Sequence, residues 1–258
     1  MKLKALLYIV AMCVMGGCLG GIFSCNRIQT NRPEEDMDSF LFDLSASMGD
    51  TSRDVVRKVD SMLQVTTDSF WYYRCLLLKS KIAFYEGRFD TSIVMLKQVE
   101  RFGNRFAEDK RVFSIWADFF NMRGNIYGRK AQIDSMIWAF EKSYYYVQKS
   151  GNARIMPDIC LNLADAYVRD GRYDWGAFWY RRSLSVMDSL RLPDYTRFPA
   201  YYGFAQVEME LRNFKDCDYY YDLACQYFDR MRPYEKHIYL NNRGNSYYFR
   251  DDYQTALT

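Results

Sequence analysis

The chain has 258 residues, of which 49% are hydrophobic, and it contains only 14 glycines and 5 prolines. So few helix-breaking residues favour an all-α fold. The 35 basic and 32 acidic residues leave a formal net charge of +3, and they are spread along the chain without a basic stripe. Direct binding of nucleic acid by this segment is therefore not expected.

The N-terminus, residues 1–25, has the features of an export or anchor segment. Two lysines precede an uninterrupted apolar or small run over residues 5–23, and a cysteine follows at Cys25. This arrangement resembles a bacterial lipoprotein signal, which implies cleavage before Cys25 and lipidation of its thiol. Cys18 is a second candidate cysteine. An uncleaved anchor helix is an alternative, because 19 residues can just span a membrane, and ordinary secretion is another.

All three alternatives place the rest of the chain outside the cytoplasm. In the first two, a lipid or an anchor helix attaches it to the bacterial envelope. Residues 26–38 are polar and contain Pro33, so we expect a flexible tether there. The remaining residues, 39–258, are expected to form one helical repeat domain. It opens with the segment Ser39–Leu44 and a helix over Ser52–Val65, which could cap the first unit. The apolar face of that helix is Val55, Val56, Val59, Met62 and Leu63.

One pattern then repeats five times, in units over roughly 69–102, 112–150, 157–191, 198–230 and 237–258. Its clearest copy reads Leu163-Ala164-x-x-Tyr167, then Gly171-x-Tyr173-x-x-Gly176, then Tyr180-x-x-Ser183. The position of Gly176 recurs at intervals of 44, 40, 41 and 39 residues, at Ser92, Met136, Gly176, Cys217 and Ala256. The pattern resembles the tetratricopeptide repeat, a helix–turn–helix unit whose usual period is about 34 residues. The resemblance implies an α-solenoid of antiparallel helix pairs, here with a period near 40 because of longer helices or linkers.

An unrelated helical bundle is the alternative, but a bundle has no reason to keep this period. Small residues on the first helices would let paired backbones approach closely: Gly124, Ala164, Ala205 and Gly244. We expect Gly124 to face Met136, so that a flexible side chain fills the space that the glycine leaves. Aromatic residues are expected to fill the layer between units: Tyr127, Phe140, Tyr167, Tyr180 and Tyr221.

The residues that usually carry catalysis or bind metals do not form a recognisable set. Cys217 and Cys225 would lie about 12 Å apart along one helix, too far for a disulfide. Cys75 and Cys160 are expected to be buried free thiols, and no CxxC motif occurs. The single histidine, His237, has no nucleophile motif beside it. We therefore expect no catalytic residue, no cofactor and no metal, and hence no enzyme.

The resemblance to tetratricopeptide repeats implies a binding surface on the inner face, built from first-helix residues about four apart. The candidates are Asn121, Asn125, Arg129, Asp165, Arg169, Tyr202, Gln206, Asn241, Asn245 and Tyr248. Asparagine can donate to and accept from a peptide backbone, and arginine can pair with carboxylates. No lysine matches the position that some tetratricopeptide domains use to hold a C-terminal carboxylate, which puts that ligand in doubt. The alternative is that these residues form solvated helix faces.

These features predict a non-enzymatic scaffold that binds a protein or peptide in the bacterial envelope. Units such as Asn162–Tyr167 with the tail Ser183–Leu190 are similar to the extracytoplasmic part of bacterial sensors that contain these repeats. That similarity implies the sensory part of a membrane-attached signalling protein. A lipoprotein scaffold for envelope assembly without signalling is one alternative. Because the sequence stops early in a fifth second helix, we also expect a truncated unit, and a fragment of a histidine kinase or transcriptional regulator is another alternative.

Overall fold

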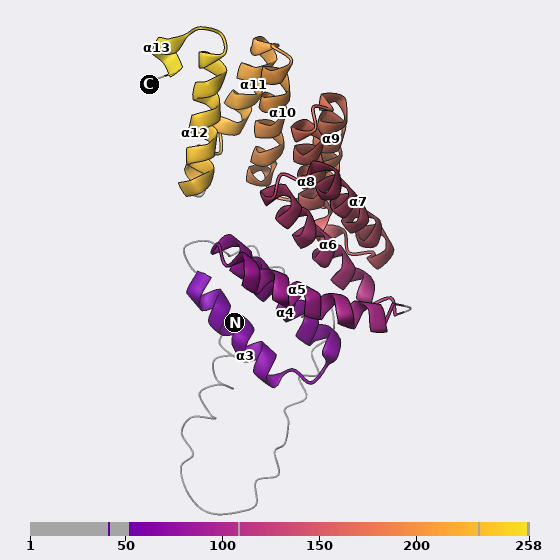
Figure 1. Ribbon diagram of the computed structural model, residues 1–258. Helices are drawn as coiled ribbons and strands as arrows, with labels where there is room; N and C mark the ends of the chain where they lie inside the picture. Colours follow the sequence, from indigo (N-terminus) through magenta and orange to yellow (C-terminus); the bar gives the residue numbers. More distant parts are fainter. Residues whose placement is uncertain (1–40, 42–51, 108, 232, 257–258) are drawn as a thin grey trace, which may run out of the picture. The chain divides into compact units, whose positions relative to one another are not determined.

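Figure 1 shows the computed structural model, which describes residues 41, 52–107, 109–231 and 233–256. These ranges contain helices, turns and short connections and no strand. Helix α3 (Ser52–Val65) has the bounds that the sequence predicts. The other α-helices that have described bounds form five antiparallel pairs, each with a first and a second helix. The pairs are α4 (Ser69–Tyr85) with α5 (Phe89–Arg105), α6 (Val112–Arg129) with α7 (Ile133–Ser150), α8 (Met156–Arg169) with α9 (Tyr173–Ser189), α10 (Phe198–Glu210) with α11 (Phe214–Cys225), and α12 (Pro233–Tyr248) with α13 (Tyr253–Ala256).

The pairs repeat with the period that the sequence predicts. The second helices begin 44, 40, 41 and 39 residues apart. Long helices account for part of the excess over an ordinary tetratricopeptide unit, since α6 and α7 have 18 residues each. Linkers account for the rest, and three of them contain short 3-10 helices: η1 (Ala153–Ile155), η2 (Asp194–Arg197) and η3 (Phe228–Arg230).

Every turn between a first and a second helix contains one residue in the left-handed region. These residues keep the same spacing as the helices: Gly87, Ala131, Gly171, Arg212 and Asp251. A left-handed residue at this place ends an α-helix and reverses the chain within a few residues. All five pairs therefore use one kind of turn, which fixes the register of each pair.

Each helix pair shares its apolar core with the first helix of the next pair. Phe140 of α7 packs with Ile159 and Leu163 of α8, and Tyr180 of α9 packs with Phe204 of α10. Aromatic residues fill these layers as predicted, because Phe140, Tyr180 and Tyr221 are almost completely buried. Helix α3 packs against α4, with Val55 and Val59 in one cluster with α4 residues and Leu41. The predicted cap of the first unit is thus confirmed.

The prediction that Gly124 faces Met136 is wrong. A Cβ atom placed on Gly124 would overlap the ring of Phe140, which lies one helical turn beyond Met136. Met136 instead lies against Gly128, 3.1 Å from where a Cβ would stand. Helical side chains lean toward the N-terminus of their own helix, so Phe140 reaches back over the position that we assigned to Met136.

Buried hydroxyl groups hold the two helices of a pair together. Ser143 Oγ donates to the backbone carbonyl of Ala117 at 2.7 Å, and Ser183 Oγ donates to that of Pro157 at 3.0 Å. Ser80 and Ser92 share a hydrogen bond of 2.9 Å between their hydroxyls. These bonds satisfy hydroxyls that would otherwise be buried without a partner.

The predicted signal or anchor segment 1–25, with Cys18 and Cys25, and the predicted tether 26–38 lie outside the described residues. Of the expected opening segment Ser39–Leu44, only Leu41 is described. None of the described helices combines the length and apolar character that a membrane crossing needs.

Candidate binding surface of the first helices

The predicted binding residues fall on the first helices of four successive pairs, mostly at matching positions. One position follows the small residue that faces the second helix. It is occupied by Asn125 on α6, Asp165 on α8, Gln206 on α10 and Asn245 on α12. Successive helical residues diverge by about 100°, so this position lies at the edge of the contact within the pair and not in its centre. We call these four residues the inner row.

The inner row presents polar groups to solvent. Asp165 and Asn245 are exposed, and Asn125 and Gln206 are half-buried. Within the described residues, the three amide side chains make no hydrogen bond, whereas Asp165 accepts one from Tyr180. Half-buried amides normally find a partner in the protein or in water, so the row has unused hydrogen-bonding capacity along successive helices.

The position one turn before the inner row links neighbouring first helices. Asn162 Nδ2 on α8 donates to Asn121 Oδ1 on α6 at 2.8 Å. Asn242 on α12 likewise donates to the hydroxyl of Tyr202 on α10. Asn121 and Tyr202, which the sequence predicts as ligand contacts, are therefore half-buried and bonded to the next unit.

Asp165 lies at the centre of a cluster that spans three helices. The hydroxyl of Tyr180, from α9, donates to Asp165 Oδ1 at 2.5 Å. Gly203 on α10 makes room for Tyr180, because a Cβ there would overlap the tyrosine ring. Tyr202 lies near enough for the charge of Asp165 to act on its hydroxyl. The cluster therefore joins the inner row to the interface between the third and fourth pairs.

The electrostatics of this cluster follow from its surroundings. Although water reaches Asp165, the protein around it raises its pKa to about 6, against the opposing effects of the Tyr180 hydrogen bond and the Arg169 charge. Burial and the same carboxylate raise the pKa of Tyr180 well above its ordinary value. Burial, and then Asp165, also raise the pKa of Tyr202. The tyrosines stay protonated, whereas Asp165 titrates in a mildly acidic range.

The two arginines of the predicted surface contact the preceding unit. Arg169 donates to the backbone carbonyl of Gly128 at 2.9 Å and lies 3.6 Å from the sulfur of Met136. The guanidinium of Arg129 lies 5.9 Å from the ring centre of Phe84 and 5.7 Å from that of Phe89. Both side chains remain exposed, so a ligand carboxylate could still reach them.

On α12 the predicted residues occupy an exposed side of the helix. Asn241, Asn245 and Tyr248 are all exposed. Asn241 donates to Asn242 at 3.2 Å, and the ring of Tyr248 contacts those of Phe249 and Tyr253.

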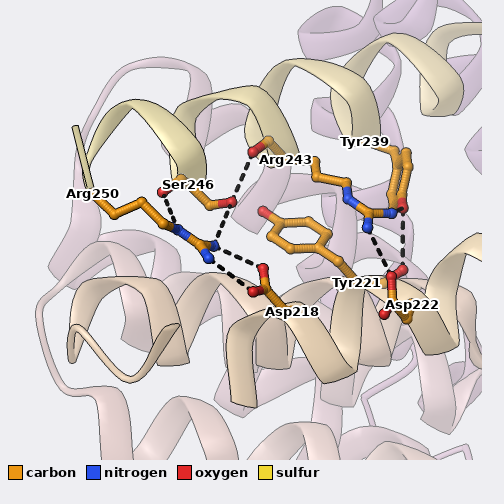
Figure 2. Close-up of polar contacts among 7 residues, drawn as sticks. All are labelled: Asp218, Tyr221, Asp222, Tyr239, Arg243, Ser246 and Arg250. Carbon is orange, nitrogen blue, oxygen red and sulfur yellow. Dashed lines mark hydrogen bonds and ion pairs between the residues drawn. The ribbon is translucent and has the colours of Figure 1, made fainter. Parts of the chain in front are cut away.

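The other side of α12 faces α11, and Figure 2 shows the polar contacts between them. Arg250, just after α12, donates two hydrogen bonds of 2.7 and 2.8 Å to the carboxylate of Asp218 on α11. Arg243 pairs with Asp222 at 2.7 Å and donates to Tyr239 at 2.5 Å. This polar network fixes how α12 presents its exposed side.

Several residues of this surface were not predicted as such. Tyr180 was assigned only to the apolar layer, and Asn162 and Asn242 were not assigned to the surface. One sequence signal was available. Asn162 and Asn242 occupy the same position of their units, two residues before Ala164 and Gly244. The ion pairs of Arg243 and Arg250 had no sequence signal that distinguished them from solvated charges.

No group of three or more His, Cys, Asp or Glu residues in the described part of the chain is arranged to hold a metal ion. Cys75 and Cys160 are buried free thiols, as predicted. Burial raises the pKa of Cys75 and of Cys217 to about 11 and that of Cys160 to about 12. Cys217 is buried and Cys225 is exposed, and they are not bonded to each other. His237 is exposed.

Comparisons with known proteins identify the fold. No protein-family model matches the chain, and no curated protein matches it. A solved structure of a Signal Transduction ATPase with Numerous Domains (STAND) protein with a tetratricopeptide repeat sensor, from Pyrococcus horikoshii, superimposes with a TM-score of 0.60 at 14% identity. The match covers 82% of this chain and 32% of that one, so the chain spans about a third of its length.

A second match is BtubC (BKLC) from P. vanneervenii, with a TM-score of 0.58 at 13% identity, covering 85% of this chain and 86% of the other. Identities this low carry the fold alone. Together with the paired helices, they show an all-α fold, a tetratricopeptide-like α-solenoid of antiparallel helix pairs.

Proposed function

We propose that the chain is a non-enzymatic scaffold whose first helices bind an extended peptide segment of a partner protein. The observation that supports this proposal is the inner row: three amides and one carboxylate at one position of four successive first helices, with the amides free of hydrogen bonds to other described residues. A solvated helix face is also polar, so the support lies in the recurrence of uncharged amides at one position in three of four units.

The chemistry of the inner row suits a peptide backbone. Each amide carries one acceptor and two donor hydrogens, and an extended segment exposes carbonyl and N–H groups in alternation. Asn125, Gln206 and Asn245 can each bond to both kinds of group. Asp165 adds an acceptor for a backbone N–H or a basic side chain. Because its pKa is raised to about 6, this acceptor is charged at neutral pH and becomes neutral in mild acid.

A peptide selection tests the proposal. Peptides selected on the purified wild-type chain from a random display library would be labelled with a fluorophore and titrated by anisotropy. The variant Asn125→Ala/Gln206→Ala/Asn245→Ala should bind roughly ten-fold or more weakly, because each lost hydrogen bond costs about 1 kcal/mol.

The matched control is Gln98→Ala/Lys142→Ala/Gln148→Ala, which truncates exposed side chains of the second helices α5 and α7. It should bind like the wild type. Both triple variants should unfold at nearly the same temperature as the wild type. The substituted side chains are exposed or half-buried and make no hydrogen bond or ion pair within the described residues, and substitutions away from such contacts usually change stability by under about 0.5 kcal/mol each. Equal affinity of the inner-row variant and the wild type for every selected peptide would refute the proposal.

We further propose that the chain belongs to the cell envelope and serves there as the sensory part of a signalling protein. The location is supported by the basic, apolar and cysteine pattern of residues 1–25. The sensory role is supported by the similarity of the repeats to bacterial sensors, and the P. horikoshii protein is also described as carrying a tetratricopeptide repeat sensor. An assembly scaffold without signalling is the competing function.

Metabolic labelling with a fatty-acid probe tests the location. The wild type should be labelled, and Cys25→Ala should not, whereas Cys18→Ala should keep the label. Labelling that persists in Cys25→Ala and disappears in Cys18→Ala would move the site to Cys18. An unlabelled wild type that stays in the soluble fraction would rule out the lipid anchor.

A further inference from the structure

The second helices carry a row of large apolar residues that point to solvent. Val94 on α5, Trp138 on α7, Phe178 on α9 and Tyr219 on α11 occupy one position of four successive units, 44, 40 and 41 residues apart. Their exposed fractions lie between 43% and 57%. Single exposed apolar residues are ordinary on protein surfaces, but repetition at one position in four units is not. We call these four residues the outer row.

The outer row lies opposite the core-facing side of each second helix. In α7, Met136, Phe140 and Ser143 are buried against α6 and α8. Trp138 comes two residues after Met136, about 200° further around the helix. The same offset separates Phe178 from buried Gly176 and Tyr219 from buried Cys217. The outer row therefore lies outside the buried core. Trp138 also contacts its own pair, because its ring meets that of Phe120 on α6 edge-on at 5.5 Å and lies 5.9 Å from the guanidinium of Arg123. Much of the Trp138 ring nevertheless remains exposed.

Carboxylates lie one helical turn before three members of the outer row. Asp90 precedes Val94, Asp134 precedes Trp138 and Asp174 precedes Phe178, each by four residues. Such residues are favourable in a first helical turn, which accounts for their presence. Within the described residues, however, these three aspartates form no ion pair, so their charges remain available to a partner.

A hollow beside Trp138 adds a place for a basic side chain. It has a volume of about 230 Å³ and is lined by Asp134, Ile137, Trp138, Glu141, Tyr167 and Arg172. Arg172 is already paired with Asp170 at 2.5 Å and stacked over Tyr167. Asp134 and Glu141 therefore leave the hollow with an excess of negative charge beside an aromatic wall, which is a favourable setting for a cation.

We propose that the outer row docks a basic, apolar segment of a partner protein, distinct from the segment bound by the inner row. Its aliphatic or aromatic side chains contact Trp138, Phe178 and the other members of the row, and its lysine or arginine side chains meet the aspartates. Asp134 and Glu141 beside the ring of Trp138 favour a basic side chain over an acidic one in the hollow. Basic residues also lie beside the row, since Lys142 and Arg182 are exposed one turn after Trp138 and Phe178. A lipid surface and a second copy of the chain are therefore occupants for the test to separate.

The test uses the full chain and a fluorescein-labelled synthetic peptide in which leucine and lysine are placed to form an amphipathic helix. Two matched peptides replace lysine by glutamate or leucine by serine. The wild type should bind only the leucine–lysine peptide. Trp138→Ser/Phe178→Ser/Tyr219→Ser should bind it roughly ten-fold or more weakly, as expected when central aromatic contacts are removed. The inner-row variant should bind it like the wild type.

A charge variant keeps the proposal testable if the serine variant does not fold. Asp134→Asn/Asp174→Asn should weaken binding several-fold at low salt, and the difference should shrink at high salt because screening acts on exposed charges. Undiminished binding by either folded variant at low salt would overturn the proposal. Equal binding of the lysine–serine peptide would reduce the surface to a nonspecific acidic patch and overturn it too.

Two further outcomes would replace the occupant. One is self-association of the wild type in sedimentation that the serine variant abolishes, together with no binding of the leucine–lysine peptide. This result would assign the outer row to a second copy of the chain. Binding to phosphatidylserine vesicles that depends on the outer row would assign it to a membrane. Monomeric wild type that binds the leucine–lysine peptide through the outer row is the expected result.

Discussion

Two successive joints of the repeat array are built from different interactions. Between the third and fourth pairs, the ring of Tyr180 enters the space above Gly203, within an apolar cluster, and its hydroxyl bonds to Asp165. Between the fourth and fifth pairs, Arg250 and Arg243 form ion pairs with carboxylates of α11 (Figure 2). The first joint depends on shape and the second on charge. One repeat architecture therefore tolerates two solutions, which should respond differently to added volume, salt and pH.

Added volume should break the joint that depends on shape, and this is the largest effect expected. Gly203→Ala places a methyl group where the ring of Tyr180 lies. Overpacking of this kind costs about 1–3 kcal/mol, even though alanine favours a helix by about 1 kcal/mol over glycine. Denaturant unfolding measures the change.

Gly128→Ala is the matched control. Its new methyl group would meet only the flexible ends of Met136 and Arg169, at 3.1 and 3.2 Å. It should be neutral or slightly stabilising. Equal destabilisation of the two variants would mean that the joint between the third and fourth pairs does not depend on a close fit.

Loss of charge should weaken the other joint by an intermediate amount. Arg250→Met removes an ion pair with Asp218 that contains two hydrogen bonds. The side chains of Arg250 and Asp218 are 20% and 38% exposed. We expect a loss of about 1–2 kcal/mol at low salt, between the values for exposed and buried pairs. The loss should shrink at high salt, whereas that of Gly203→Ala should not.

Arg182→Met provides the control, because Arg182 is exposed and makes no hydrogen bond or ion pair within the described residues. It should change stability by under about 0.5 kcal/mol. A cost for Arg250→Met that is independent of salt would show that packing of its side chain, and not its charge, stabilises the joint between the fourth and fifth pairs.

The smallest expected effect is a change of stability with pH at the joint between the third and fourth pairs. The pKa of Asp165 is raised to about 6 in the folded protein from an ordinary value of 3.8. The folded state therefore binds the proton more tightly, so the contribution of Asp165 to stability is greatest below pH 3.8 and is lost as pH rises through 6. Asp165→Asn should stabilise the protein at neutral pH and lose this advantage in acid.

Because solvent reaches Asp165, we expect a gain of about 1 kcal/mol or less. The measurement is the difference in unfolding temperature between Asp165→Asn and the wild type across this pH range. Asp229→Asn, at an exposed carboxylate that forms no ion pair within the described residues, is the control and should not show the same profile. A difference for Asp165→Asn that does not change with pH would contradict the raised pKa.

The sequence predicted the units well because helix packing is periodic. Small and aromatic residues recur in phase, and the bounds of α3 follow from its apolar face and from the residues around it. The mistake at Gly124 has a physical origin. Spacing along the chain indicates which residues face the partner helix. The direction in which each side chain points then decides which of two residues one turn apart fills the space above the glycine. Phe140 fills it in place of Met136.

The candidate surface was predictable only in part. Periodicity placed Asn125, Gln206 and Asn245 at one position of their helices, because that position depends on one helix alone. It could not show that Asn121 bonds to Asn162 or that Tyr180 bonds to Asp165. Those contacts depend on the offset between neighbouring units and on how deeply a ring enters the interface, and neither leaves a mark in the spacing of residues.

The shared left-handed turn has a consequence for how the chain folds. A non-glycine residue in that conformation costs about 1–2 kcal/mol, and less for aspartate. Ala131 and Arg212 bear this cost and Asp251 a smaller one, whereas Gly87 and Gly171 do not. Contacts within one hairpin are close in sequence, so a hairpin can form early and its neighbours can add to it. We therefore expect nucleation at the hairpin around Gly171, which combines a glycine turn with buried Tyr180 and Ser183, and growth of the ordered array outward from the third pair.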